Sequence, residues 1–409
     1  MKVVVTGTRG IPDILGGVET HCEELFPRIC DMGIDVTVIR RSCYVSPENR
    51  RDQYKGVSLV DVYAPRRKSL EAIVHTFLAI IKARRLNADI VHIHAIGPSL
   101  MAPFARLLGM KVVTTHHGPD YDRKKWGFLA KTMLKAGEWC GAHFSNEVIV
   151  ISQVISDILR TKHHRTSNLI YNGVTPPVRS SNTDYIESLG LTSGKYVVAV
   201  GRFVKEKCFD MLIDAFTALN PEGYKLVIAG DADHPDDFSE MLKDKARRSG
   251  TVLTGFIRGE RLNQILTNAA LFVLPSTHEG LPISLLEAMS YGLDVLVSDI
   301  PANRLPQLAA DDMFLTGNVD ALREALRRKL ANTQPRTYDL APYNWDNIAR
   351  QTVDVYLHAI EGSHIPLRRH KETARHNVPN LSCRKIWELP QKIITFAKVN
   401  SAFLEFLRS

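Results

Sequence analysis

The sequence predicts an α/β protein made of two doubly wound domains, each built on a parallel sheet. Three observations lead to this prediction. Short apolar segments alternate with helical segments along most of the chain. The alternation weakens over residues 180–194, which are rich in Ser, Asn, Thr and Gly, and then begins again. The chain has 409 residues, a length typical of two domains.

In the first half, an apolar strand runs into a glycine-rich loop, and a helix is expected after the loop, over residues 19–32. The strands expected in this half are 3–6, 36–39, 90–94, 111–115 and 148–151. Short apolar strands that alternate with helices are typical of a parallel sheet covered on both faces. The first domain is therefore predicted to be Rossmann-like, over residues 1–178.

The second half repeats the pattern and predicts a second Rossmann-like domain over residues 186–340. Its expected strands are 196–200, 226–229, 252–253, 271–274 and 295–297, and its expected helices are 209–218, 237–248, 261–269, 283–291 and 319–330. A further helix over 343–361 is expected to cross back to the first domain. Residues 362–409 form a basic extension with a partial apolar stripe over 393–407.

Composition is that of an ordinary globular protein, with 44% hydrophobic and 23% charged residues. No stretch is apolar for long enough to predict a transmembrane helix. A strand is expected from the second residue onward, so no signal peptide is predicted. The six cysteines contain no CxxC pair and are expected to be reduced, as in the cytosol.

The charge is unevenly distributed along the chain. Residues 1–178 contain 24 Lys and Arg against 16 Asp and Glu, a net charge of +8, whereas residues 179–361 have a net charge of −6 and residues 362–409 one of +6. This asymmetry favours an anionic partner, such as lipid headgroups or a lipid-linked diphosphate, although it is also compatible with a solvated surface and no partner. Nucleic acid is disfavoured because no aromatic residues are interleaved with the basic clusters.

Ligands of doubly wound sheets bind in the loops that follow the strands. The loop after the strand at 196–200 reads GRFVKEK and contains Arg202 and Lys207. Arginine can hold a phosphate through two hydrogen bonds, and lysine adds a mobile positive charge. The pair therefore predicts a phosphate site, with an unpartnered surface pair as the alternative.

A second loop, EGLPISLLEAMSYG, leads into the helix at 283–291. Pro282 suits the first position of that helix, and Gly292 suits its end. The free N–H groups of Ile283, Ser284 and Leu285 are predicted to bind an anion. A carboxylate lies on each side of this anion site: Glu279 before the helix, and Glu287 about 7 Å along its axis. They suit the sugar and the ribose of a sugar nucleotide, or they are ordinary helix carboxylates.

Together with YNGV at 171–174 and DIVHIH at 89–94, these two loops resemble the retaining glycosyltransferases of family 4, which have the GT-B fold. The resemblance covers about residues 1–361. The stretches GTRGIPDILGGVETHCEEL and HHGPDYDRKKWG are similar to a bacterial subset that includes rhamnosyltransferases of cell-surface polysaccharide assembly. The resemblance implies transfer of a hexosyl group from a nucleoside-diphosphate sugar to a glycan or a lipid-linked saccharide.

The resemblance also implies a role for each matched residue. Arg202 and Lys207 would bind the donor diphosphate, Glu287 the ribose and Glu279 the donor sugar. His117 would lie near the reacting sugar, and the adjacent His116 is easily mistaken for it. The catalytic set is thus Glu279, His117, Arg202 and Lys207, and the donor- and acceptor-binding set is Gly16, Gly17, Arg202, Lys207, Glu279, Gly280, Leu281, Pro282, Ile283, Ser284 and Glu287.

No cofactor or metal is expected. The GDADH segment contains an Asp-x-Asp pair, Asp231 and Asp233, but protein cations and a helix N-terminus already supply positive charge for the diphosphate. The pair is therefore predicted to lie near the nucleotide base or in a solvated turn. Three departures from the family pattern are Cys208 in place of a common Gly, Asp294 in place of a common Pro, and Tyr171 in place of a common Pro.

Rival functions remain open at this point. A nicotinamide-dependent oxidoreductase is disfavoured because the first loop lacks the G-x-G-x-x-G spacing, although Arg40 and Arg41 could suit a 2′-phosphate. Two further candidates are a sugar-nucleotide epimerase and a catalytically silent sugar-nucleotide-binding protein. The donor sugar cannot be read from the sequence, and dTDP-rhamnose or a UDP-sugar are the leading candidates.

The predicted location is the cytoplasm, with peripheral binding to the inner face of the membrane through the first domain. This expectation rests on four basic clusters of that domain, Arg40–Arg41, Arg50–Arg51, Arg66–Lys68 and Arg84–Arg85. Each surface Lys or Arg contributes about 1 kcal/mol near an anionic bilayer.

Overall fold

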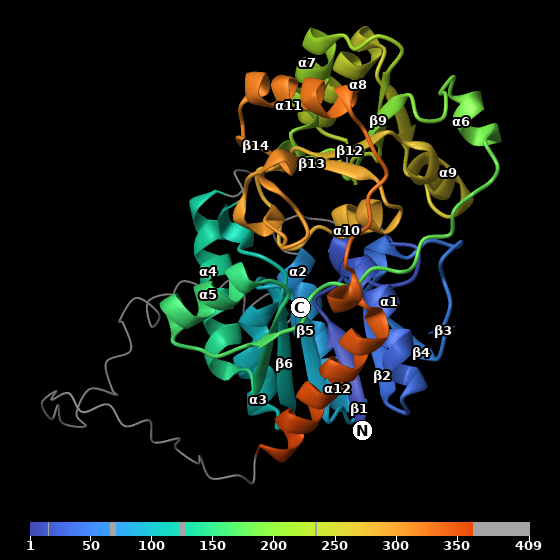
Figure 1. Cartoon of the computed structure of the whole chain (residues 1–409). Helices are drawn as coiled ribbons and strands as arrows, with labels where there is room; N and C mark the ends of the chain where they lie inside the picture. Colours follow the sequence, from blue (N-terminus) through green and yellow to red (C-terminus); the bar gives the residue numbers. More distant parts are fainter. Residues whose placement is uncertain (15, 66–70, 123–126, 234, 363–409) are drawn as a thin grey trace, which may run out of the picture. The chain divides into compact units, whose positions relative to one another are not determined.

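The computed structural model describes residues 1–14, 16–65, 71–122, 127–233 and 235–362, and its two sheets are shown in Figure 1. The first sheet has eight strands in the order β3-β4-β2-β1-β5-β6-β7-β8. All its neighbouring strands are parallel except β3 and β4. Its strands are β1 (Lys2–Thr6), β2 (Asp35–Arg41), β3 (Gln53–Tyr54), β4 (Val57–Val62), β5 (Ile90–His94), β6 (Lys111–His116), β7 (Glu147–Val150) and β8 (Asn168–Leu169).

The second sheet has six parallel strands in the order β11-β10-β9-β12-β13-β14. These strands are β9 (Tyr196–Val200), β10 (Lys225–Ala229), β11 (Val252–Gly255), β12 (Leu271–Leu274), β13 (Asp294–Ser298) and β14 (Met313–Phe314). The two parallel sheets confirm the predicted α/β class.

Helices lie against both sheets (Figure 1). In the first half they are α1 (Gly17–Asp31), α2 (Glu71–Arg85), α3 (Ala102–Leu107), α4 (Phe128–Phe144) and α5 (Gln153–His163). In the second half they are α6 (Asp184–Ser188), α7 (Phe209–Leu219), α8 (Asp237–Ser249), α9 (Glu260–Asn268), α10 (Ile283–Ser290), α11 (Val319–Ala331) and α12 (Trp345–Glu361).

Each sheet has a point at which its strand order reverses. In the first sheet the chain runs outward from β1 to β2 and β4, and then returns to the other side of β1 to form β5. In the second sheet the corresponding neighbours are β9 and β12. The loops that follow such a pair of strands diverge and leave a crevice at the carboxyl edge of the sheet. The loops after β9 and β12, which are far apart in sequence, therefore line the same crevice.

The helix α12 packs against the first sheet, although it follows the second sheet in the chain. Trp345, Ile348 and Tyr356 belong to the same apolar cluster as strand residues of the first sheet. The chain approaches this helix closely at Gly173, where an added Cβ atom would lie 2.3 Å from the Trp345 ring. Only glycine allows this approach, which explains the glycine of the YNGV segment.

Several elements of the structure were not predicted from the sequence. The strand β4 reads VSLVDV, with Val57 and Leu59 buried and their neighbours more exposed, so its alternation was visible in the sequence. The strands β3, β8 and β14 have two residues each, which is too short for any periodicity. The apolar stripe at 393–407 and the cluster Arg66–Lys68 lie outside the described residues.

Two of the predicted surface arginines, Arg40 and Arg41 at the end of β2, are buried. The Arg40 side chain donates to Asp61 Oδ1 at 2.7 Å and to the carbonyl of Asn49. Arg41 donates to Glu71 Oε1 at 2.7 Å. Neither guanidinium can face a membrane or the 2′-phosphate of a coenzyme, so this part of both sequence interpretations was wrong. A strand-end Arg pair gives no sign of burial until its carboxylate partners are known.

Candidate active site

One cavity of about 540 Å³ lies at the carboxyl edges of both sheets. Residues from the first half of the chain form one wall, and residues from the second half form the other. The cavity is lined by every residue of the predicted catalytic and binding sets: Gly16, Gly17, His117, Arg202, Lys207, Glu279, Gly280, Leu281, Pro282, Ile283, Ser284 and Glu287. The sequence motifs thus converge on one place.

The start of α10 differs by one residue from the prediction. Pro282 lies just before the helix, and its carbonyl accepts the N–H of Leu285 at 3.1 Å. The amides of Ile283 and Ser284 make no hydrogen bond within the described part of the chain, whereas that of Leu285 is already used. The predicted anion site is therefore reduced to two N–H groups, which still point out of the helix end.

Lys207 and Glu279 form a direct ion pair. Lys207 follows β9, Glu279 follows β12, and the Lys207 Nζ–Glu279 Oε1 distance is 2.6 Å. The side chains are largely buried, with 17% and 12% of their surface exposed, so solvent screens the pair only partly. The predicted phosphate ligand and the predicted sugar ligand are thus already in contact.

Arg202 forms a second ion pair with a residue from the GDADH segment. Asp233 Oδ2 lies 2.8 Å from Arg202 Nη1 and 3.0 Å from Nη2 of Arg9, which belongs to the loop after β1. These two guanidinium groups lower the pKa of Asp233 against the opposing effect of its burial. Asp231 pairs separately with Lys243 at 3.0 Å. Asp233 is therefore a partner of two arginines, which rules out the solvated turn, whereas a position near the nucleotide base, the other alternative, stays a prediction.

Glu287 lies in the wall of the cavity together with Glu23, Glu24 and Arg258. Burial raises the pKa of Glu287 to about 7, with a further contribution from Glu24, and Arg258 opposes this increase. Arg258 also reaches across the cavity, since its Nη2 lies 3.4 Å from the carbonyl of Ile14. A carboxyl group in this position can share a proton with a neighbouring hydroxyl or accept hydrogen bonds from a diol.

Two glycines of the predicted set are favoured by local geometry: Gly16 by its positive φ, and Gly280 by a close approach of backbone. Gly16 has φ of 148°, and an added Cβ atom would lie 2.0 Å from the Glu19 carboxylate. That carboxylate accepts from Thr8 Oγ1 and from the amide of Arg9, so it shapes the loop after β1. At Gly280 an added Cβ atom would lie 2.1 Å from the carbonyl oxygen of His117. Gly280 thus lets the two walls of the cavity meet.

The two adjacent histidines have different surroundings. His116 is buried, its Nε2 lies 3.0 Å from Glu138 Oε2, and its Nδ1 accepts the amide N–H of Gly118. His117 is half-buried and lines the cavity, with its Nε2 2.9 Å from Nδ1 of His94. Burial lowers the pKa of His117 well below its usual value. The choice of His117 over His116 as the cavity residue agrees with this placement.

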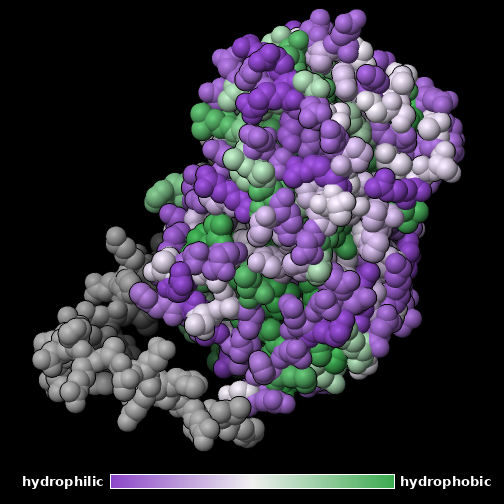
Figure 2. Space-filling view, viewed as in Figure 1, coloured by the Kyte–Doolittle hydropathy of each residue, from purple (hydrophilic) through white to green (hydrophobic). Residues whose placement is uncertain are grey.

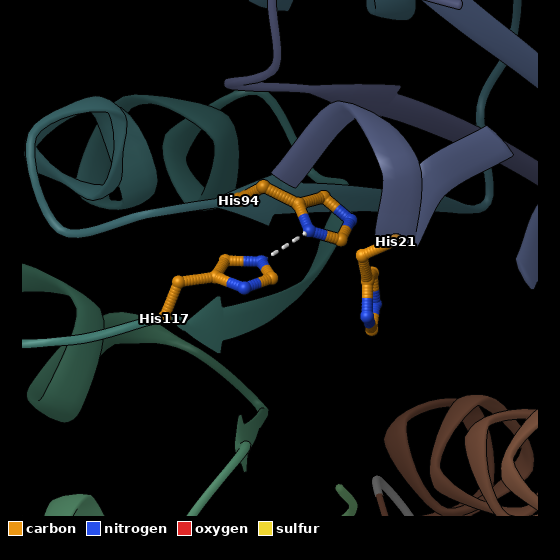
Figure 3. A group of neighbouring side chains, drawn as sticks. All are labelled: His21, His94 and His117. Carbon is orange, nitrogen blue, oxygen red and sulfur yellow. Dashed lines mark hydrogen bonds between the residues drawn. The ribbon is translucent and has the colours of Figure 1, made fainter. Parts of the chain in front are cut away.

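His21, His94 and His117 form a cluster (Figure 3), and one ring nitrogen from each lies within 4.8 Å of the other two. Tetrahedral zinc with Zn–N bonds of about 2.0–2.1 Å requires nitrogens roughly 3.3 Å apart. His94 Nδ1 and His117 Nε2 already share a hydrogen bond, and Nε2 of His94 has no acceptor among the described residues to orient it as a metal ligand. The cluster as placed fits a hydrogen-bonded group better than a metal centre.

The three departures from the family pattern leave the cavity intact. Cys208 has φ of 52° and ψ of 35°, the left-handed region in which glycine is favoured. Its carbonyl still accepts the N–H of Leu212 as α7 begins. Asp294 is buried and paired with Lys329 at 2.6 Å. Tyr171 packs against Tyr343, with ring centroids 5.4 Å apart.

The sequence analysis missed several residues of this site. Glu23 and Glu24 lie on the second turn of α1, and Arg258 lies in the loop after β11. Arg258 could have been found, because every loop after a parallel strand reaches the same edge of the sheet. Asn172 of the YNGV segment donates its Nδ2 to the carbonyl of Leu281 at 2.8 Å, while its Oδ1 lies 3.0 Å from His21 Nδ1.

Comparisons with known proteins agree with this architecture. Residues 15–176 match the model described as Glycosyltransferase Family 4, and residues 194–332 match that described as Glycosyl transferases group 1. An uncharacterized glycosyltransferase of Methanocaldococcus jannaschii is 27% identical over 395 residues, which cover 88% of this chain and 99% of that protein.

Solved structures agree as well. Sucrose-phosphate synthase from Thermosynechococcus elongatus superposes with a TM-score of 0.73 at 17% identity, over 88% of this chain and 99% of that one. HepE of Anabaena, solved in complex with UDP, superposes with a TM-score of 0.67 at 17% identity, over 87% of this chain and 100% of that one.

The fold is that of the GT-B class. The chain is a glycosyltransferase, as the two matched models and the relatives show. Its specific resemblance to rhamnosyltransferases stays a prediction, since the relatives compared above do not test it.

The raised pKa of Glu287 predicts a pH-dependent stability. Between about pH 4.5, the usual value, and pH 7 the unfolded chain releases this proton while the folded protein keeps it. The free energy of unfolding should therefore fall as the pH rises through this window, by up to about 3 kcal/mol at 1.36 kcal/mol per pKa unit. Glu287→Gln should remove this loss.

Urea unfolding of the ligand-free protein at pH 4.5 and pH 8 measures the effect. The Gln variant should gain stability relative to the wild type only at the higher pH. Glu222→Gln, at an exposed position, is the control. An equal difference between Glu287→Gln and the wild type at both pH values would contradict the prediction.

Proposed function

We propose that the enzyme transfers a hexosyl group, with retention of configuration, from a nucleoside-diphosphate sugar to a glycan or lipid-linked saccharide in cell-surface polysaccharide biosynthesis. The observation that carries this proposal is the convergence of Arg202, Lys207, the first two amides of α10 and Glu287 on one cavity. These groups suit the diphosphate and the ribose of one donor molecule, and the glycosyltransferase class supplies the reaction.

The donor diphosphate would replace the carboxylates that now neutralise the cations. Lys207 is bound by Glu279 and Arg202 by Asp233, each within hydrogen-bond distance. A diphosphate placed at the amides of Ile283 and Ser284 would compete for both cations. Glu279, released from Lys207, would then be available to accept hydroxyls of the donor sugar.

Retention is proposed to occur by a front-face mechanism. The bond between the anomeric carbon and the leaving phosphate oxygen breaks, and the acceptor oxygen bonds to the same face of that carbon. The proton of the acceptor hydroxyl passes to an oxygen of the leaving diphosphate. This mechanism needs no covalent nucleophile, because the acceptor oxygen itself attacks the anomeric carbon, and Glu279 is proposed only to accept hydroxyls of the donor sugar.

The negative charge that develops on the leaving diphosphate would be stabilised by Arg202, Lys207 and the α10 amides, with no metal required. His117 would orient the donor sugar. The acceptor would enter from the side of Gly16 and Gly17, which line the cavity where α1 begins. A donor of dTDP-rhamnose or UDP-hexose type is proposed, supported by the UDP complex of the structural neighbour.

A peripheral place on the inner face of the membrane is also proposed. Among the described residues no helix is long and apolar enough to span a bilayer. The face shown in Figure 2 is mainly hydrophilic. With Arg40 and Arg41 buried, the exposed arginines among the described residues of the four clusters are Arg50, Arg84 and Arg85.

The first test is transfer itself, in the presence of excess EDTA. With dTDP-rhamnose or a UDP-hexose as donor, activity should persist, and NMR of the product should show the anomeric configuration of the donor. Loss of activity with EDTA and rescue by Mn²⁺ would contradict the metal-free mechanism. An inverted product would contradict retention, and oxidation, epimerisation or binding without turnover would favour the rival functions.

Variants separate the proposed roles. Arg202→Ala and Lys207→Ala should each lose about 3–4 kcal/mol of transition-state stabilisation, mainly in kcat. Glu287→Ala should instead raise the donor KM, because ribose contacts persist from the ground state to the transition state. Lys205→Ala, an exposed lysine of the same loop, is the matched control. A Glu287→Ala effect confined to kcat would refute the ribose assignment.

Flotation with liposomes tests the membrane proposal. The full chain should bind anionic vesicles at low salt and leave them at high salt, because surface charge attraction is screened. Arg84→Glu with Arg85→Glu should weaken this binding. Equal binding to neutral and anionic vesicles, or none to either at low salt, would leave the charge asymmetry without this explanation.

A further inference from the structure

The hydrogen bond between His94 and His117 raises the question of which nitrogen carries the proton. Each neutral imidazole has one N–H group and one lone pair. The answer decides whether His117 offers the cavity a donor or an acceptor. The contacts around the histidine cluster allow the protons to be assigned one ring at a time.

The tautomer of His21 follows from its contact with Asn172. The Asn172 amide Nδ2 donates to the carbonyl of Leu281, so its Oδ1 must be the atom that faces His21. His21 Nδ1 therefore carries the proton and donates it across the 3.0 Å contact. The lone pair of His21 is left on Nε2, and His21 cannot serve as a second donor within the cluster.

The position of the proton on His94 follows from the surroundings of its second nitrogen, Nε2. Nε2 of His94 is fully buried and has no hydrogen-bond partner in the part of the chain that the structure describes. An orphaned buried N–H group is rarer and costlier than an under-used acceptor. The proton therefore lies on Nδ1, which donates it to His117 Nε2 at 2.9 Å.

These two assignments leave only one possible tautomer for His117. Its Nε2 accepts from His94, so its own proton lies on Nδ1. Nδ1 of His117 makes no hydrogen bond to any described residue, and His117 lines the cavity. Figure 3 shows this nitrogen turned away from His94. Burial lowers the pKa of both His94 and His117 well below the usual value, so single protonation holds at neutral pH.

We propose that His94 is a positioning residue that fixes the tautomer of His117, so that His117 presents an Nδ1–H donor to an oxygen of the bound substrate. This inference rests on the proposed function and specifies that His117 acts as a hydrogen-bond donor. An N–H donor suits a sugar hydroxyl or a phosphate oxygen. A neutral imidazole with its lone pair toward the cavity would instead repel the leaving phosphate.

The direct test is the ¹⁵N NMR spectrum of the histidine rings in the full ligand-free chain. The chain has 15 histidines, so His117→Gln is needed to assign the signals of that ring. The expected spectrum has a protonated Nδ1 and an unprotonated Nε2 at His117. A proton on Nε2 would overturn the proposal. This readout needs no turnover, so it is independent of the donor and acceptor proposed above.

A matched pair of variants tests the role of His94. Asn and Leu have nearly the same shape, but only Asn can donate a hydrogen bond from about the place of His94 Nδ1. His94→Leu should release the tautomer of His117, so that both forms appear, and lower kcat by about 10²-fold, the lower end of the loss for one removed donor. His94→Asn should keep the tautomer and restore most of kcat.

His143→Gln, at an exposed histidine outside the cavity, is the control for general effects of losing an imidazole. Equal kcat values in the Asn and Leu variants, with an unchanged His117 spectrum in both, would overturn the positioning role. If the Leu variant does not fold, the wild-type spectrum and the Asn variant still decide the question.

Discussion

The side chain of Asn172 joins the two halves of the active site. Its amide nitrogen holds the carbonyl of Leu281, in the loop before α10, and its oxygen holds the ring of His21 on α1. Both contacts are buried, where an unpaired polar group is costly. The loop that contains Glu279 and Gly280 is therefore tied to α1, and this link lies beside the closest approach of the two walls.

Two of these contacts show how little space is left between the walls. Gly280 lies so close to the His117 carbonyl that a methyl group in its place would clash with the backbone. Arg258 spans the opening to reach the Ile14 carbonyl. The shape of the cavity depends on close backbone approaches as well as on side-chain chemistry. A glycine such as Gly280 is therefore as important to the cavity as its charged residues.

The sequence predicted the site best where the position of a residue follows directly from the order of the parallel strands. Loops after neighbouring strands at a switch point line the same crevice, so Lys207 and Glu279 could be placed at one site from their positions after β9 and β12 alone. Apolar strands and glycine-rich loops likewise predicted both sheets. Boundaries were less accurate, as Pro282 shows, because a helix start depends on which carbonyl accepts the first N–H.

What the sequence could not show depends on long-range partners. Arg40 and Arg41 were predicted to be exposed because their carboxylate partners, Asp61 and Glu71, are 21 and 30 residues away in the sequence. The contact between His94 and His117 spans 23 residues, and that between Arg9 and Asp233 spans 224. No local sequence pattern predicts such pairs, and each pair changes the role expected for a residue that was already named from the sequence.

Asp233 has a wider consequence for how the enzyme meets its donor. Its carboxylate lies between Arg9 and Arg202, so the ligand-free enzyme already contains an anion of its own beside the two guanidinium groups. In the donor complex proposed above, the arriving diphosphate would exchange with this resident charge. The electrostatic gain of binding would then be the difference between two anions, and not the full attraction of an unpaired cation. The Asp233 carboxylate also offsets the repulsion between the two guanidinium groups in the ligand-free enzyme, and by returning to them it would help the nucleotide product to leave.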